Sequence, residues 1–182
     1  MEAASQVSSV IGFGQEFDGA DDYIDLGASA SLDGAAALTI SFWCYADSVR
    51  FPSISGIFSR GSNSRQVPMI YGVPDQDYLL FRMETPDNAG DGEVITTGLT
   101  RQNWHYISFT WDGSVVTAYV DAVPGAKDNT EGTVLSDTDG DNFIGNVSGD
   151  GKWDGKLDEL RVSRKARSAD WIKLSYETQK MD

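Results

Sequence analysis

Apolar and polar residues alternate along much of this chain, which predicts β-strands rather than helices. The clearest case is the segment 38–45, where every second residue is apolar or cysteine and the others are hydroxyl-bearing or aromatic. Because successive side chains of a strand point to opposite faces of the sheet, this segment predicts a core face and an outer face. Shorter runs, bounded by turn clusters rich in Gly, Pro, Ser and Asn, occupy 14–17, 23–26, 56–59, 69–72, 78–83 and 143–145.

The runs 104–111 and 114–121 predict a β-hairpin. They are joined by Asp112-Gly113, and Asp-Gly between two strand-like runs is a strong signal for a two-residue turn. The resulting register pairs Phe109 with Val116 on the core face. The opposite face of the hairpin carries hydroxyl-bearing and aromatic residues, so it matches the outer face of the first long strand.

The segment 155–163 also predicts a strand, and its alternation raises a question of charge. It places Asp158 on the same face as two apolar residues further along, so a carboxylate begins a core-facing series. A buried carboxylate is costly unless it is paired, hydrogen-bonded or bound to a metal. We expect it to meet the acidic turn 18–22 near the other end of the chain. The alternatives are backbone N–H donors and an ion pair with Lys156 or Arg161, although alternation puts Arg161 on the opposite face.

The segment 168–179 predicts a helix with Ser168 as its N-cap. The residues that would pack it against a sheet are Trp171 and Leu174, with Ile172 and Tyr176 as further candidates. About a dozen short strands followed by one late helix predict an all-β sandwich of two antiparallel sheets, which fills residues 1–182 as a single domain. Residues 1–12 carry few apolar anchors, so we expect a loosely held lead-in.

The net charge of the chain limits the classes of ligand that it can bind. Its 182 residues include 28 Asp and Glu against 14 Lys and Arg, which gives a net charge of -14 and a pI of about 4.3. Nucleic acids and anionic membrane surfaces require basic residues, so this balance argues against both. It favours a hard cation such as Ca²⁺, which binds carboxylate and carbonyl oxygens. No apolar run approaches the ~20 residues of a membrane span, and no signal-peptide pattern opens the chain.

Two residues that could serve as catalytic groups are better interpreted as core. The single cysteine, Cys44, lies in the apolar run of 38–45 and predicts a small buried hydrophobe. The single histidine, His105, falls on the core face at the end of the hairpin. There we expect a mostly buried, hydrogen-bonded ring rather than a general base. Nothing in the sequence places these two residues in contact.

Six stretches match, in the correct order, the motifs of one family. Residues 17–27 read Phe-Asp-Gly-x-x-Asp-Tyr-Ile-x-Leu-Gly, residues 104–113 Trp-His-Tyr-Ile-Ser-Phe-Thr-Trp-Asp-Gly, and residues 155–162 Gly-Lys-Leu-Asp-Glu-Leu-Arg-Val. With 38–43, 118–121 and 143–145, they resemble the laminin-G-like domains of the concanavalin A-like lectin and glucanase family, and 166–172 resembles its bacterial branch. The resemblance implies a concanavalin A-like jelly-roll β-sandwich with one short C-terminal helix. Ala122 departs from the family pattern, which has Gly there.

The resemblance also implies a structural Ca²⁺ where the first and last core strands meet. The ligands that it carries over are Asp18 and Asp158, with Asp22 and Glu159 as further candidates. If no metal binds, a dense hydrogen-bond cluster should join the Asp18 turn to Asp158. The acidic run 136–142 has the alternating carboxylates of a calcium loop's first half. It lacks the following Gly and the closing Glu, so we interpret it as a solvated turn.

The outer face of the predicted sheet is the candidate ligand site. Sugars stack their apolar ring faces on aromatic side chains, while their hydroxyls take hydrogen bonds. The residues that would supply these contacts are Trp43, Tyr45, Arg82, Tyr106, Ser108, Thr117 and Tyr119. As an alternative, the C-terminal helix or a loop covers this face and turns Trp43 and Tyr119 into second-layer core. The loops 60–68 and 85–92 offer a separate rim site.

These features predict a non-catalytic, lectin-like carbohydrate-binding module of a secreted, surface or virion-displayed protein, working as part of a larger assembly. Glycosidases of this superfamily carry Glu-x-Asp-x-(x)-Glu on one strand, and no such triplet occurs here. The alternative is a structural or adhesion domain that contacts another protein. Exposed aromatics in a groove favour glycan binding, whereas a flat polar surface with an apolar patch favours a protein partner. We expect no nucleic-acid binding and no membrane insertion.

Overall fold

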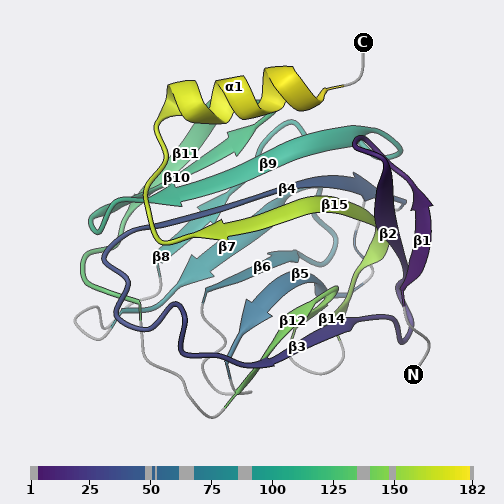
Figure 1. The fold of residues 1–182 in the computed structure, drawn as a ribbon, viewed down its shortest axis with the longest axis horizontal. Coiled ribbons are helices and arrows are strands. Elements are labelled where there is room, and N and C mark those ends of the chain that lie inside the picture. The colour runs from purple at the N-terminus through teal and green to yellow at the C-terminus, as the bar shows by residue number, and fades with distance from the viewer. Residues whose placement is uncertain are drawn as a thin grey trace.

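Two antiparallel sheets stacked face to face, with one helix on the outside, make up the protein (Figure 1). This computed structural model describes residues 4–47, 51, 53–61, 68–85, 92–134, 140–147 and 151–180. The seven-stranded sheet has the order β1-β2-β15-β4-β9-β10-β11, and the six-stranded sheet has the order β3-β12-β5-β6-β7-β8. A separate two-stranded ribbon is formed by β13 and β14. The predicted all-β sandwich with a short C-terminal helix is confirmed.

The predicted strand-like runs each coincide with one strand of the structure. The seven-stranded sheet contains β1 (Ser5–Ser8), β2 (Phe13–Asp18), β4 (Leu38–Ala46), β9 (Trp104–Trp111), β10 (Val115–Val120), β11 (Val123–Asn129) and β15 (Asp154–Ser163). The six-stranded sheet contains β3 (Ile24–Ala28), β5 (Ser55–Arg60), β6 (Met69–Gly72), β7 (Leu79–Met83), β8 (Gly92–Ile95) and β12 (Asp141–Ile144). The remaining elements are β13 (Asn146–Val147), β14 (Gly151–Lys152) and α1 (Ala169–Gln179). Outside the predicted runs lie β1, β8, β11 and the ribbon.

The core lies between the two sheets and follows the alternation seen in the sequence. Ile40, Phe42 and Phe109 of the seven-stranded sheet and Ile70 and Phe81 of the six-stranded sheet are all 0–1% exposed. Phe81 and Phe109 stack across the interface with ring centroids 5.1 Å apart. Burial of one such side chain contributes about 1.5–3 kcal/mol, so this layer holds the two sheets together.

The β9–β10 hairpin turns one residue later than predicted. Phe109 pairs with Ala118 instead of Val116. The carboxylate of Asp112 accepts two backbone N–H groups from the following residues, at 3.0 and 2.8 Å, and the turn is centred on Gly113-Ser114. This local side-chain hydrogen bonding replaces the tight Asp-Gly turn. Each residue of β9 pairs with a residue of β10 two positions later than predicted. Because side chains alternate with a period of two, this even shift leaves the core and outer faces as predicted.

A β-bulge in β15 overturns the predicted face of Asp158. Leu157 pairs with Cys44 and Asp158 pairs with Trp43, after which the register shifts. Glu159 lies in this irregularity with a positive φ of 52°. Because a bulge inserts an extra residue, the alternation is reset. Leu157 is therefore the core residue, at 3% exposure, and Asp158 lies on the outer face beside Trp43. The prediction that Asp158 begins a core-facing series is wrong.

The N-terminal segment is anchored rather than loose from residue 5 onward. Residues 5–8 form β1, an edge strand that pairs with β2. In the turn that follows, the hydroxyl of Ser9 and the N–H of Ile11 both donate to the carboxylate of Asp158. These contacts tie the segment to β15, so the predicted loose lead-in is corrected for the part of it that the structure describes.

Helix α1 begins where the sequence predicts. Ser168 is its N-cap, and the hydroxyl of Ser168 accepts the N–H of Trp171 at 3.2 Å. The helix lies on the outer face of the seven-stranded sheet (Figure 1) and buries Ile172 completely. Leu174 is 63% exposed and does not dock the helix, because residues two apart lie on opposite sides of a helix. Within the described ranges, no helix combines the length and apolar character needed to span a membrane.

Candidate functional site

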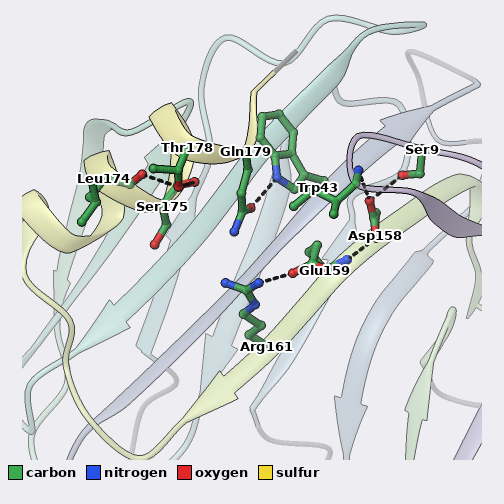
Figure 2. A network of polar contacts seen from close by, with 10 residues as sticks. Ser9, Trp43, Asp158, Glu159, Arg161, Leu174, Ser175, Thr178 and Gln179 are labelled. Carbon is green, nitrogen blue, oxygen red and sulfur yellow. Dashed lines mark hydrogen bonds and ion pairs between the residues drawn. The ribbon is translucent and has the colours of Figure 1, made fainter.

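Helix α1 covers the face that carries most of the predicted ligand residues. Trp43 and Tyr106 are 3% and 1% exposed, and both rings pack against Tyr176 of α1, with ring centroids 5.7 and 6.3 Å away. The indole Nε1 of Trp43 donates to Oε1 of Gln179 at 2.8 Å (Figure 2). Tyr119 and Ile172 complete this second core layer.

The predicted sugar platform is therefore not formed by these residues. Trp43, Tyr106, Ser108, Thr117 and Tyr119 are all buried. A sugar ring cannot stack on side chains that a helix already covers. The structure instead shows the alternative weighed from the sequence, in which the C-terminal helix turns the outer face of this sheet into second-layer core.

Tyr45 and Arg82 are the two predicted ligand residues that stay partly exposed, and they lie on different sheets. Tyr45, near the end of β4, contacts Trp104 with ring centroids 5.7 Å apart, and Nζ of Lys156 lies 4.8 Å from the centroid of the Tyr45 ring. Arg82 lies on β7 in the six-stranded sheet. The structure does not bring these two residues together in one site.

The outer face of the six-stranded sheet gathers partly exposed charged side chains. In the register, Arg82 lies between Met69 and Glu93, whereas Ile70, the next residue along β6, is buried in the core. Because side chains alternate along a strand, Arg82 and its lateral partners point outward. Nη2 of Arg82 lies 3.3 Å from Oε1 of Glu84, and the Arg82 side chain is 30% exposed.

Aromatic residues share this face with Arg82. Tyr71 lies two residues after Met69 on β6, so it points the same way. Phe143 of β12 pairs with Ser59 of β5, which pairs in turn with Met69. Ser59 is fully buried and its hydroxyl donates to the carbonyl of Asn146, so the β13–β14 ribbon lies over β5 between Phe143 and Tyr71. The ring of Tyr23 meets Phe143 edge to face, with centroids 5.6 Å apart. Tyr71, Arg82, Glu93 and Phe143 are termed the six-stranded face below.

An acidic pocket lies where the end of β2 meets the start of β15. Its volume is about 570 Å³, and its charged lining residues are Glu16, Asp18, Asp22, Asp47 and Asp154. Asp154 pairs with Asp18 in the register of the two strands. Carboxylate oxygens of Asp18, Asp21 and Asp22 lie within 4.8 Å of one another. The chain folds so that several negative charges converge on one small volume.

The charges in this pocket destabilise one another. Burial raises the pKa of Asp154 above its usual value, and the carboxylates of Asp47 and Asp18 raise it further. Backbone N–H donors, that of Ala20 above all, hold the pKa of Asp18 below its usual value. Asp18 is therefore ionised. It lies beside Asp154, whose ionised form is disfavoured by burial and by repulsion from the neighbouring carboxylates. A bound cation would stabilise both.

The donor set fits a calcium ion. Ca²⁺ binds oxygens at about 2.3–2.6 Å, so two of its ligands lie at most roughly 5 Å apart. The 4.8 Å spread of the Asp18, Asp21 and Asp22 oxygens is within this limit, and Asp154 and Asp47 line the same pocket outside that cluster. The turn itself uses one oxygen of each carboxylate, since Oδ1 of Asp18 accepts the N–H of Ala20 at 2.8 Å and Oδ2 of Asp22 accepts the N–H of Asp18 at 3.2 Å. The second oxygen of each is left for a metal.

Asp158 does not reach this pocket, contrary to the prediction. Its carboxylate accepts the hydroxyl of Ser9 at 2.7 Å and the N–H groups of Ile11 at 3.0 Å and Glu159 at 2.7 Å (Figure 2). Glu159 is likewise outside the pocket and pairs with Arg161. The alternative of backbone N–H donors is therefore the one that the structure shows for Asp158.

Asp154 takes the place that was predicted for Asp158. It lies four residues earlier on the same strand and faces Asp18 across the β2–β15 pair. Of the predicted metal ligands, Asp18 and Asp22 line the pocket, while Asp154 and Asp47 are additions from the structure. No local pattern distinguishes them, because their contribution depends on strand register and not on neighbouring residues.

Cys44 and His105 lie side by side in the sheet but are not arranged for nucleophilic catalysis. They are directly paired residues of β4 and β9. Burial raises the pKa of the Cys44 thiol, which disfavours the reactive thiolate. Nε2 of His105 accepts the N–H of Thr100 at 3.1 Å, which leaves a proton on Nδ1 for Asp121, 2.8 Å away. The prediction of a mostly buried, hydrogen-bonded histidine is confirmed, since its side chain is 12% exposed.

Two of the sequence predictions fall on residues outside the described ranges. The alternative rim site includes 62–67 and 86–91, and the acidic run 136–142 includes 136–139.

A comparison with protein families identifies the fold. The family described as the Concanavalin A-like lectin/glucanases superfamily, a laminin-G group, matches residues 18–173. The chain belongs to this superfamily. The match runs from the end of β2 into α1, so the resemblance to laminin-G-like domains is confirmed for nearly the whole concanavalin A-like domain.

Several solved structures similar to this concanavalin A-like domain are described as domains of larger proteins. The binding domain of Paraclostridial Mosquitocidal Protein 1 has a TM-score of 0.76 and 15% identity over 96% of this chain and 45% of its own. Domain 4 of AbnA, a GH43 extracellular arabinanase from Geobacillus stearothermophilus, in complex with arabinotriose, has a TM-score of 0.74 and 16% identity over 95% of this chain and 81% of its own. The receptor binding domain of botulinum neurotoxin mosaic serotype C/D has a TM-score of 0.72 and 14% identity over 97% of this chain and 45% of its own.

Identities this low show a shared fold alone. The chain spans less than half of the mosquitocidal and neurotoxin binding domains and most of domain 4 of AbnA. No curated protein matches the chain.

Proposed function

We propose that this domain is a non-catalytic carbohydrate-binding module whose ligand lies on the six-stranded face. The observation that carries the proposal is that α1 closes the outer face of one sheet, whereas the other sheet presents partly exposed aromatic rings next to an ion pair. Tyr71 offers a surface on which a sugar ring can stack, and Phe143 offers a second one on the other side of the β13–β14 ribbon. Arg82 and Glu84 offer a donor and an acceptor to its hydroxyls. The arabinotriose complex of domain 4 of AbnA supports a saccharide as the ligand.

Tyr71→Ala is expected to weaken saccharide binding by about tenfold or more without unfolding the domain. Truncating an aromatic anchor of a binding site costs more than about 1 kcal/mol, and about 1.4 kcal/mol corresponds to tenfold in Kd. A glycan array, with arabinotriose among the probes, would select the ligand, and calorimetric titration would then give Kd for wild type and variant. Leu174→Ala is the control, because Leu174 is exposed on α1 beyond the opposite sheet. Equal loss in both variants, or no loss in Tyr71→Ala, would contradict the proposal.

We propose that the acidic pocket binds a structural Ca²⁺ through the turn carboxylates of Asp18, Asp21 and Asp22. Asp154, which pairs with Asp18 in the β2–β15 register and lines the same pocket, is the further ligand from β15. The ion would join the end of β2 to the start of β15 and neutralise the repulsion between Asp154 and its neighbours. Oxygen ligands from a turn suit Ca²⁺ because it tolerates irregular coordination. The ion would stabilise the fold by holding the two ends of the domain together.

Calcium is expected to raise the melting temperature, and EDTA to lower it again. An ion that binds only the folded state stabilises it by about 2.7 kcal/mol at a hundredfold excess over Kd. Asp154→Asn should abolish most of this shift, whereas Asp77→Asn, at an exposed position that does not line the acidic pocket, should retain it. Scanning calorimetry of the three proteins with Ca²⁺ and with EDTA tests this. A melting temperature that does not respond to EDTA would rule the metal out.

A protein-binding or adhesion role is the second candidate, and one surface feature favours it. Ile11 and Phe13, which flank Gly12, are 40% and 66% exposed. Large exposed apolar side chains that cluster mark interaction surfaces. The receptor binding domain of a botulinum neurotoxin shares the fold. A blank glycan array in the presence of Ca²⁺ would make this the preferred function.

We infer that the module acts outside the cell as part of a larger protein. Similar structures are domains of toxins and of an extracellular arabinanase, which supports this setting. The net charge of -14 weighs against nucleic acid as a partner.

A further inference from the structure

A second cavity lies at the opposite end of β15 from the acidic pocket. β15 begins at Asp154, which lines the acidic pocket, and ends just before Arg164, which lines a cavity of about 400 Å³. Residues of β3, β5 and β12 and of the segment after β3 form its other walls. No member of the six-stranded face lines it. It is termed the arginine cavity, after Arg60 and Arg164.

The charge of the arginine cavity is opposite to that of the chain. Two arginines and no carboxylate occur among its described lining residues, although Asp and Glu outnumber Lys and Arg by 28 to 14 in the sequence. The acidic pocket, at the other end of the same strand, has five carboxylate side chains and no basic one among the lining residues that the structure describes. A concave surface with one sign of charge raises the local concentration of the opposite ion. The arginine cavity therefore favours an anionic ligand.

The two arginines are held in different ways. Arg60 is 1% exposed and pairs with Asp33, so its charge is balanced within the protein. Arg164 donates from Nη1 to the carbonyl of Ser31 at 3.2 Å and from Nη2 to the carbonyl of Asp33 at 3.3 Å. Both acceptors are neutral, and Arg164 makes no ion pair with any residue that the structure describes. Two of its five N–H donors thus position the guanidinium, and the others are left for a ligand.

The remaining lining suits an organic anion better than a small inorganic ion. Leu26 and Val162 are 52% and 37% exposed, and the buried Phe58 also lines the cavity. Ser29 and Ser31 add hydroxyls. An inorganic anion would gain nothing from apolar walls, whereas an organic anion with an apolar face and hydroxyl groups would contact all three kinds of residue.

We propose that the arginine cavity binds the carboxylate of an acidic saccharide, that is, of a uronic acid residue. The guanidinium of Arg164 donates to the carboxylate, a pairing for which arginine's planar fork is suited. The apolar face of the ring lies on Leu26 and Val162, and its hydroxyls meet Ser29 and Ser31. The choice of a sugar as the body of the ligand rests on the proposed carbohydrate-binding function, whereas the preference for an anion follows from the cavity alone.

The test compares oligogalacturonate with its methyl ester, which keeps the ring and the hydroxyls but removes the charge. Titrations are made in EDTA, so that calcium does not bridge the uronate to the acidic pocket, at a temperature where circular dichroism shows a folded domain. Wild type is expected to bind the acid at least about tenfold more tightly than the ester. Arg164→Gln should remove this preference and leave binding of the ester unchanged. Arg161→Gln, a control three residues earlier, on β15 and outside the cavity, should keep it.

A second variant separates binding from folding. Leu26→Glu adds a carboxylate at an exposed position of the cavity, so it should weaken oligogalacturonate binding about tenfold with an unchanged melting temperature. Equal affinity for acid and ester, no binding of either, or equal losses in Arg164→Gln and Arg161→Gln would each overturn the inference.

Tyr71→Ala distinguishes the two proposals. If Tyr71→Ala abolishes saccharide binding and Arg164→Gln has no effect, the six-stranded face stands and the arginine cavity fails. The reverse result supports the arginine cavity and removes the six-stranded face.

Discussion

Trp43→Ala is expected to lower the free energy of unfolding by about 3–5 kcal/mol. Trp43 is 3% exposed, lies 5.3 Å from Tyr106 and 5.7 Å from Tyr176 between ring centroids, and donates its indole N–H to Gln179. Truncation removes this burial, opens a cavity under α1 that the rigid sheet cannot fill, and leaves the amide of Gln179 without its donor. Since the same contacts hold α1 on the sheet, the helical signal should be lost at lower denaturant concentration than in wild type.

Urea unfolding followed by circular dichroism measures this effect, with two variants for calibration. Leu174→Ala, on the exposed side of α1, should change the free energy of unfolding by less than about 0.5 kcal/mol. Gln179→Ala removes the hydrogen bond without the ring and should cost about 1 kcal/mol. If Trp43→Ala behaved like Leu174→Ala, α1 would not cover this face in solution, and the face would again be a candidate surface for sugar.

Asp158→Ala is expected to destabilise the fold by about 2–3 kcal/mol, independently of calcium. Its carboxylate is the acceptor for one hydroxyl and two backbone N–H groups, from Ser9, Ile11 and Glu159. Removing it leaves partly buried donors without an acceptor and detaches the turn after β1 from β15. Ser9→Ala removes one donor and one hydrogen bond only, so it should cost about 1 kcal/mol.

The calcium response separates this role from metal binding. Asp158→Ala should retain the full shift in melting temperature between Ca²⁺ and EDTA, whereas Asp154→Asn should lose it. Thermal unfolding of both variants under the two conditions is the measurement. A loss of the calcium shift in Asp158→Ala would show that the carboxylate serves the acidic pocket after all, against its observed hydrogen bonds.

The covering of the seven-stranded sheet by α1 has a consequence for function. It removes the part of the outer face around Trp43, Tyr106 and Tyr119 from contact with ligands and leaves the six-stranded face and the two end cavities. These cavities carry opposite charges at the two ends of β15. A cation at one end and an acidic sugar at the other would occupy the same molecule without competing for a site.

The site could be predicted from the sequence in part. Asp18 and Asp22 lie in one turn, so their proximity follows from four residues of chain, and they do line the acidic pocket. Asp154 and Asp47 lie far from them in sequence and join them only through strand pairing. Arg60 and Arg164 are likewise about a hundred residues apart. Their cavity exists only because β5 and the end of β15 approach the segment after β3.

The sequence by itself determined the local features of this protein. Alternation along 38–45 and 104–111 set the strands and their core faces, and Ser168 set the start of α1, because these depend on side chains a few residues apart. The tertiary structure alone decided which outer face stays open and where Asp158 points. One inserted residue at the Glu159 bulge reverses every later side chain of β15, and no local preference marks that residue. Whether Trp43 stacks on a sugar or on Tyr176 likewise depends on α1, a helix more than a hundred residues away in the sequence. The helix covers Trp43 because burying the apolar surfaces of the helix and of the sheet against each other is favourable.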